Sequence, residues 1–138
     1  MNLGGRQSIG DLSKKAGVKV VTIRYYEQVG LTPAPPRTGR NYRAYNQEHL
    51  HRLRFIRRCR ALGFKLDQIR DLLYLSTCTA RDCSEVDRIT LNHVRDIERR
   101  VADLKSLAAE LRRISKRCPG KGLISDCRIL EALWPASE

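Results

Sequence analysis

The feature that most constrains this chain is a long segment, about residues 84–116, in which apolar residues recur at every third or fourth position. The recurring residues are Ile97, Val101, Leu104, Ala108 and Leu111, with Leu107 and Ile114 beside them. Alternating steps of four and three are typical of a coiled-coil seam. A helix this long has too little of its own chain left to cover the seam. The pattern therefore predicts a homodimer, in which the same helix of a second subunit covers it.

Shorter elements are predicted on both sides of this segment. Helical spacing indicates helices over residues 8–16, 20–29, 47–62 and 66–75, and a short apolar turn over 129–134. Ser8 and Asp11 provide a cap for the first helix, and Gly17 separates it tightly from the second, as in a helix-turn-helix. Prolines exclude a regular helix after residue 31, so residues 31–45 are interpreted as a loop or a two-stranded wing.

These elements predict a mainly α fold with three parts. Residues 1–76 would form a winged helix-turn-helix DNA-binding domain. Residues 77–117 would form a hinge and the dimerisation helix. Residues 118–138 contain Cys118 and Cys127, whose thiolates can bind one ion, and would form a short C-terminal metal-binding loop and terminal helix.

Positive charge is concentrated in the first half of the chain. The net charge is +12, and residues 1–65 hold 14 Lys and Arg against 3 Asp and Glu, whereas residues 66–138 hold 13 against 12. An excess confined to one segment favours a nucleic-acid surface over a uniformly solvated one.

The chain contains neither a run of about 18 apolar residues nor an N-terminal apolar stretch typical of a signal peptide. We therefore expect a cytoplasmic protein with no membrane partner. Thiols are kept reduced in that compartment, so the five cysteines are not expected to form a disulfide framework.

The candidate DNA-contacting residues lie on the second helix and in the wing. The second helix of such a motif enters the major groove, where Arg reads guanine edges and Thr contacts a base or a phosphate. Basic and aromatic residues in the wing suit phosphate or minor-groove contacts. One of the two adjacent tyrosines must point inward on a helix. The candidates are Lys19, Thr22, Arg24, Tyr25, Tyr26, Arg37, Asn41, Tyr42 and Arg43, and Arg54, Arg57 and Arg58 extend the basic surface.

Three runs of sequence carry a resemblance to a known family: TIRYYEQVGL, RNYRAY and LRFIRRCRALGFKLDQIRDLL. With the prolines between the first two, they resemble the N-terminal domain of the MerR family, and the likeness extends over residues 8–134. The resemblance implies an antiparallel coiled-coil dimer that binds a palindromic promoter. It also implies repression until an effector binds, followed by operator distortion that lets RNA polymerase use the promoter. Arg24, Tyr26, Arg37, Tyr42 and Arg43 stand at the family's DNA-contacting positions.

Three cysteines bracket the long helix. Cys83 precedes it, whereas Cys118 and Cys127 follow it across a loop that can bring two thiolates onto one ion. About 33 helical residues span about 50 Å at ~1.5 Å each, so Cys83 cannot reach Cys118 of its own chain. In the antiparallel dimer that the resemblance implies, Cys83 of one subunit lies beside Cys118 and Cys127 of the other, which gives two shared three-thiolate sites.

The metal-sensing branch of the family has cysteines at these same places. Sensors of monovalent ions usually carry Ser at the first, so Cys83 implies a divalent ion. The spacing of Cys118 and Cys127 is similar to that in mercury and lead sensors. The loop CPGKGLISDC lacks the extra Cys and His usual in zinc sensors of the family, although a single zinc ion stays open. It also lacks the cysteine-rich iron–sulfur loop of the redox branch.

Ligand chemistry agrees with the resemblance, because thiolates favour soft ions. The candidate cofactor is Hg, Pb, Cd or Zn, with Asp126 or water as a further ligand for zinc. Cys78 is retained as a candidate fourth thiolate, and Cys59, on an apolar stripe, is expected to be buried.

Other function classes find less support. No phosphate loop, nucleophile elbow or paired-carboxylate motif indicates an enzyme. A drug-sensing relative would need a larger ligand-binding domain after residue 134, and a purely architectural DNA-binding protein would not need this cysteine geometry. A thiol redox switch is the main alternative. In it, Cys83 and Cys118 of two subunits would form disulfides, with Arg81 and Arg117 lowering the pKa of the thiols.

Overall fold

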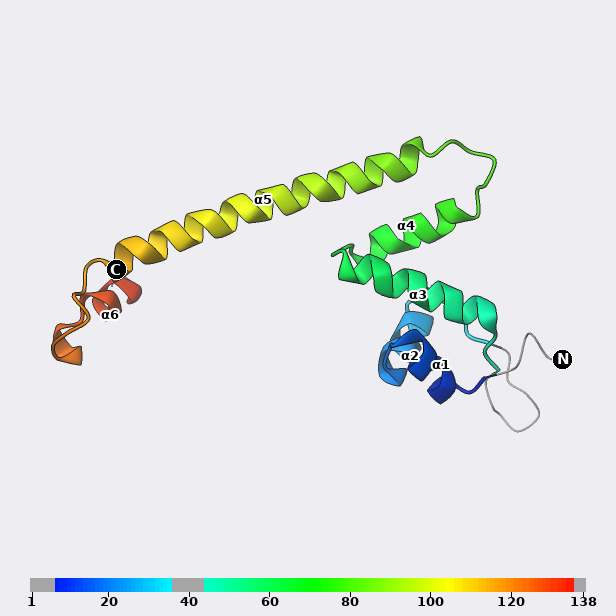
Figure 1. Cartoon of the computed structure of the whole chain (residues 1–138), viewed down its shortest axis with the longest axis horizontal. Coiled ribbons are helices and arrows are strands. Elements are labelled where there is room, and N and C mark those ends of the chain that lie inside the picture. The colour runs from blue at the N-terminus through cyan, green and yellow to red at the C-terminus, as the bar shows by residue number, and fades with distance from the viewer. Residues whose placement is uncertain (1–6, 36–43, 136–138) are drawn as a thin grey trace. The chain divides into compact units, whose positions relative to one another are not determined.

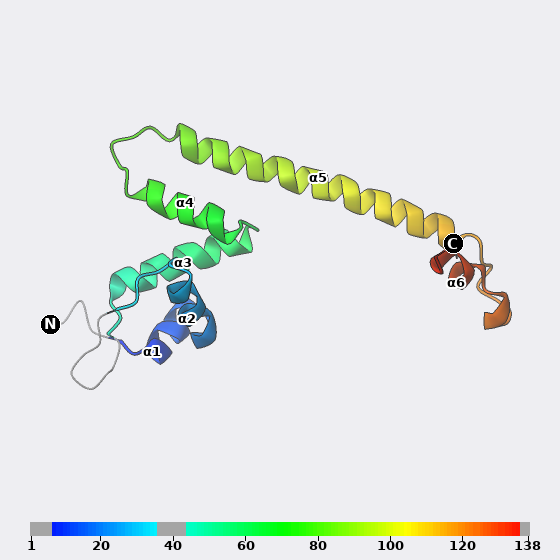
Figure 2. The same cartoon turned by 180° about the vertical axis from the view of Figure 1, so that it is seen from behind.

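The computed structural model describes residues 7–35 and 44–135, and the ordered elements in these ranges are helical (Figures 1 and 2). The helices are α1 (Ile9–Ala16), α2 (Val20–Gln28), α3 (Gln47–Ala61), α4 (Leu66–Ser76), α5 (Ser84–Ser115) and α6 (Arg128–Leu133), with a 3₁₀ turn, η1 (Ile124–Asp126), before α6. The predicted helices are confirmed, and their ends differ from the predicted ones by at most one residue. The chain divides into two units, residues 1–86 and 87–138.

The first unit contains a helix-turn-helix supported by two further helices. Helix α1 packs against α2 and α3, and α3 packs against α4 (Figure 1). The buried apolar side chains come from all four helices and from the residues that flank them. They are Leu12, Ala16, Ile23, Tyr26, Leu31, Tyr45, Leu50, Leu53, Ile56, Cys59, Phe64, Ile69, Leu72 and Leu73. This shared core fixes the orientation of α2 relative to its neighbours.

Local capping explains where α1 and α3 begin. The Ser8 hydroxyl accepts a hydrogen bond from the Asp11 N–H at 3.1 Å, and the Asp11 carboxylate accepts one from the Ser8 N–H. Asn46 and His49 form the equivalent pair at the start of α3. These reciprocal bonds satisfy N–H groups that have no partner inside the helix. Burial lowers the pKa of His49, which agrees with its use as an acceptor here.

Gly17 makes the tight turn between α1 and α2. Its φ of 68° lies in the left-handed region, and a Cβ there would lie 2.5 Å from Nη1 of Arg57. Arg57, on α3, donates through the same nitrogen to the Ala16 carbonyl at 3.5 Å. Arg57 therefore supports the turn, and its side chain remains exposed, as the predicted basic surface requires.

Gly17→Ala is expected to destabilise the fold more than Gly30→Ala. Both glycines have positive φ, 68° and 77°, so either alanine costs about 1–2 kcal/mol of backbone strain. Only Gly17 has a neighbour that must move, and losing the Arg57 hydrogen bond adds up to about 1 kcal/mol. Urea unfolding of both variants measures the difference. Equal losses would show that Arg57 does not support the turn.

The segment between α2 and α3 lies only partly within the described residues. Tyr45 pairs with Gln7 in an isolated antiparallel bridge, with N–H to O distances of 2.8 and 3.0 Å. The Tyr45 hydroxyl donates to the Glu27 carboxylate on α2 at 2.8 Å. The base of the predicted wing is therefore tied to α2 and to the N-terminal segment, whereas residues 36–43 lie outside the described residues.

Helix α5 leaves its apolar seam exposed. Val94, Ile97, Val101, Leu104, Leu107 and Leu111 keep between 41% and 64% of their surface accessible. Fully burying a Val, Ile or Leu side chain is worth about 1.5–3 kcal/mol. Covering this row would therefore contribute several kcal/mol, as the seam pattern predicts for a helix with a partner. Within the described ranges, none of the helices combines the length and the apolar character needed to cross a membrane.

Candidate functional site

Helix α2 presents one outward face beside the turn. Val21, Arg24, Tyr25 and Gln28 are all exposed and follow the i, i+3, i+4, i+7 spacing of a single helix face. Lys19 is exposed just before the helix, and Thr22 is half-buried. Of the predicted DNA-contacting residues on or beside this helix, Lys19, Arg24 and Tyr25 are therefore exposed. Sequence reasoning missed Val21 and Gln28; the helical spacing from Arg24 and Tyr25 was the signal that could have found them.

The two adjacent tyrosines have different environments. Tyr25 is 48% exposed, whereas Tyr26 is 8% exposed and belongs to the core. The expectation that one of them points inward is thus met by Tyr26. Its ring is packed in the core and cannot stack on a base, so its assignment to DNA contact stays a prediction that excludes stacking.

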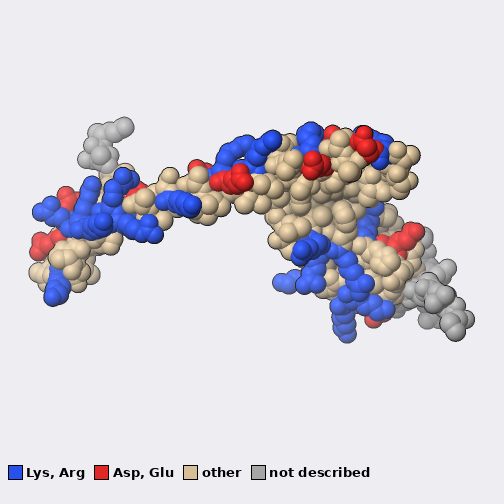
Figure 3. Space-filling view, turned by 45° about the horizontal axis from the view of Figure 1, so that its top comes forward, with Lys and Arg blue, Asp and Glu red and all other residues tan. Residues whose placement is uncertain are grey.

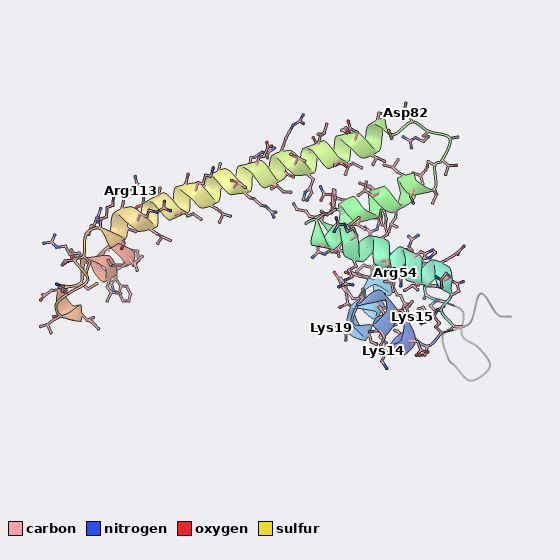
Figure 4. The ribbon with its side chains drawn as sticks, viewed as in Figure 1. Lys14, Lys15, Lys19, Arg54, Asp82 and Arg113 are labelled. Carbon is pink, nitrogen blue, oxygen red and sulfur yellow. The ribbon has the colours of Figure 1, made fainter. Side chains whose placement is uncertain are left out.

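Cations from three helices surround the turn. Lys14 and Lys15 end α1, Lys19 precedes α2, and Arg54 lies on α3, all within the first unit (Figure 4). Figure 3 shows Lys and Arg side chains gathered over this part of the unit, with few acidic side chains among them. A cluster of this kind suits the phosphate backbone of a nucleic acid.

Other arginines of the first unit bind the protein's own backbone. Arg52 Nε donates to the Leu31 carbonyl at 3.0 Å, and Arg70 donates to the Val29 carbonyl at 2.7 Å. Both carbonyls lie just after α2, where a helix end attracts positive charge. Arg52 and Arg70 therefore fix the C-terminal end of α2. Sequence reasoning missed these roles, because the partners are far away in the chain.

Four predicted DNA-contacting residues fall outside the described residues. They are Arg37, Asn41, Tyr42 and Arg43. Their assignment stays a prediction.

In the second unit, Cys118 and Cys127 lie together at the two ends of one loop. A hollow of about 390 Å³ is lined by both cysteines together with Arg117, Lys121, Asp126 and Arg128. Gly120 and Gly122 have φ values of 76° and 110°, which side-chain-bearing residues rarely adopt, so these glycines allow the loop to turn back. Both thiols are partly accessible. The loop thus brings the two thiols to one hollow.

The thiol of Cys127 is the more readily ionised of the two cysteines that have shifted pKa values. Its pKa is lowered by a hydrogen bond from the Leu130 backbone, and further by those from the Ile129 backbone and the Cys118 side chain, against a smaller opposing effect of burial. Burial raises the pKa of Cys59, the core cysteine. The expected burial of Cys59 is confirmed.

Cys127 is expected to react with iodoacetamide at least about tenfold faster than Cys59 at pH 7.5. The thiolate is the nucleophile, so a lowered pKa and an accessible sulfur both increase the rate. Mass spectrometry of chymotryptic peptides after timed alkylation measures both rates. Faster labelling of Cys59 would contradict the assignment of these environments.

Cys83 and Cys78 lie before α5. Cys83 is exposed, whereas the thiol of Cys78 donates to the Tyr74 carbonyl at 3.6 Å, at the end of α4. Helix α5 is continuous over 32 residues, about 48 Å at ~1.5 Å per residue, between Cys83 and Cys118. Across the described ranges of this single chain, no three His, Cys, Asp or Glu side chains group as metal ligands.

Comparison with known protein families identifies the family that has this combination of elements. A family model described as the MerR HTH family regulatory protein matches residues 7–75, and a second model, described as MerR, DNA binding, matches residues 50–114. This chain belongs to the MerR family. The MerR-type helix-turn-helix thus comprises α1 and α2, and the second match extends along α5.

Individual MerR-family proteins match over most of their length. The HTH-type transcriptional regulator HmrR of Sinorhizobium medicae is 40% identical over 126 residues, which cover 91% of this chain and 85% of that protein. The mercuric resistance operon regulatory protein of Bacillus cereus is 41% identical over 125 residues, which cover 91% and 95%. The crystal structure of the transcription regulator PbrR691 from Ralstonia metallidurans, in complex with lead(II), has a TM-score of 0.83 and 39% identity, and covers 93% of this chain and 99% of that one.

Proposed function

We propose that this MerR-family regulator is a homodimer that binds a palindromic promoter and activates transcription when a soft divalent metal ion binds to cysteine thiolates. The main support is the position of three cysteines at the two ends of α5. Cys118 and Cys127 line one hollow after the helix, and Cys83 is exposed before it. An antiparallel pairing of α5 brings Cys83 of one subunit to the Cys118–Cys127 loop of the other. The exposed seam of α5 supports that pairing.

The donor set supports the class of ion. Three thiolates without imidazole favour a soft cation such as Hg, Pb, Cd or Zn. Arg117, Lys121 and Arg128 line the same hollow and offset the negative charge that three thiolates leave around a divalent ion. Two matching relatives are, by their own descriptions, a mercuric resistance regulator and a lead(II) complex.

Binding of DNA is assigned to the exposed face of α2. Arg24 is proposed to read a guanine edge, with Lys19, Thr22 and Tyr25 on bases or phosphates and the Tyr26 hydroxyl on a phosphate. The wing residues Arg37, Asn41, Tyr42 and Arg43 are proposed to contact the backbone beside it. Both DNA-binding units of the dimer would be bound to the operator. Metal binding at the ends of the dimer would change the conformation of this operator, so that RNA polymerase can use the promoter.

Transcription with purified components tests this function. An operator is first selected from a random duplex library with the wild-type protein, placed in a promoter, and transcribed by RNA polymerase with and without each ion. We expect at least one of the four ions to increase the transcript. Arg24→Ala is expected to weaken operator binding about tenfold or more, since an Arg–base pair is worth about 1–3 kcal/mol.

Arg99→Ala is the matched control for the loss of one positive charge. Arg99 lies on α5, with an exposed side chain in an ion pair with Asp96 at 3.5 Å. Exposed pairs contribute little, so this variant is expected to bind the operator normally. No response to any of the four ions, with operator binding intact, would contradict metal-dependent activation.

A further inference from the structure

Val21 is the most exposed large hydrophobic residue among the described residues of the first unit. Its side chain is 74% exposed on the first turn of α2. It shares the outward face of the helix with Arg24, Tyr25 and Gln28. An apolar side chain thus stands among the residues that the proposed function assigns to DNA.

Folding does not account for a valine at this position. The buried residues of α2 are Ile23 and Tyr26, and Val21 lies on the opposite side of the helix. A β-branched side chain loses rotamer freedom in a helix, so alanine would suit an exposed helical position better. Val21 therefore costs helix stability without packing in the core, and its use is expected to lie outside the subunit.

The surroundings of Val21 indicate what covers it. Lys19 precedes it by two residues and Arg24 follows by three, so the patch is flanked by cations and suits a groove lined by phosphates. The apolar group that the major groove exposes is the C5-methyl of thymine, which distinguishes thymine from cytosine.

We propose that Val21 packs against the C5-methyl group of a thymine in each operator half-site, and so determines part of the operator sequence. This inference rests on the proposed role of α2 in reading DNA. Burying one methyl group is worth about 0.8 kcal/mol, which corresponds to roughly a fourfold change in affinity per half-site.

Replacing thymine by deoxyuridine tests the contact, because only the methyl group is lost. Each thymine of the selected operator is replaced in both half-sites, and dissociation constants are measured for wild type and Val21→Ala at fixed salt. We expect one symmetric position at which deoxyuridine weakens the wild-type complex by roughly fifteenfold, for two methyl groups. At that position Val21→Ala is expected to bind both duplexes with similar affinity.

Lys19→Ala is the control on the same helix. Losing a cation weakens binding to both duplexes alike, so its thymine-to-deoxyuridine ratio is expected to equal that of wild type. A ratio near one at every position in wild type overturns the Val21 assignment, as does a full methyl effect in Val21→Ala. A different result would contradict the proposed role of α2 in reading DNA. In that case, the Arg24→Ala variant would bind the operator with wild-type affinity.

Discussion

Replacing Leu104 by glutamate is expected to convert the proposed dimer into monomers of 15.8 kDa. Leu104 lies in the middle of the α5 seam and is 64% exposed in the single chain. In the proposed dimer, each subunit would lose a buried leucine and gain a carboxylate that has no partner in an apolar seam. Together, these two losses per dimer raise the dimer dissociation constant by at least about 100-fold. Sedimentation equilibrium measures it.

Leu62→Glu provides the matched control. Leu62 follows α3, off the seam, and is 49% exposed. The same change of charge there is expected to leave the dimer intact. Wild-type protein that sediments as a monomer, or a Leu104→Glu dimer as tight as wild type, would contradict a coiled coil built on this stripe.

Replacing Cys83, Cys118 or Cys127 singly by serine is expected to abolish metal-induced transcription while operator affinity stays within about twofold of wild type. Each change removes one of three thiolates, and a hydroxyl is a poor ligand for a soft ion. Cys83 is exposed and the other two are partly accessible, so the fold should tolerate serine. Run-off transcription and gel-shift titration measure the two effects separately.

Cys78→Ser separates a three-thiolate site from a four-thiolate site. The Cys78 thiol bonds the Tyr74 carbonyl, a role that a hydroxyl can also fill. We expect this variant to respond to metal like wild type. Loss of the response would assign Cys78 to the site as a fourth ligand. A normal response in Cys83→Ser would refute the cross-subunit site itself.

Most of the fold could be predicted because its signals are local. The Ser8–Asp11 cap, the Asn46 cap and the left-handed Gly17 are each decided within a few residues of sequence. The seam of α5 is likewise a repeat that is visible in the sequence itself. For these reasons, the helices begin and end within one residue of their predicted positions.

What the sequence could not decide depends on contacts between distant residues. Which of Tyr25 and Tyr26 points inward follows from the packing of α2 on its neighbours. The hydrogen bonds of Arg52, Arg57 and Arg70 reach carbonyls 21 or 41 residues away, so the sequence pattern could not show them. His93 and Ile89 are buried in α5, although both lie outside the predicted seam.

The candidate metal site combines both kinds of information. The glycine-containing loop between Cys118 and Cys127 predicts that the two thiols lie together, and they line one hollow. The third ligand belongs to a second subunit in our proposal. One chain contains all three residues but cannot bring them together across a continuous α5.

Mixed dimers test the central claim most directly. In a dimer of one Cys83→Ser subunit and one Cys118→Ser subunit, a shared site retains one complete set of three thiolates, whereas both sites are incomplete in either homodimer. Differently tagged subunits allow the mixed dimer to be purified, and thiolate-to-metal charge-transfer absorption reports binding of Hg, Pb, Cd or Zn under reducing conditions. We expect one tightly bound ion per mixed dimer and none in either homodimer. A mixed dimer that binds no ion, beside a wild-type dimer that does, would contradict the shared site; a wild-type dimer that binds none of the four ions would favour a thiol redox switch.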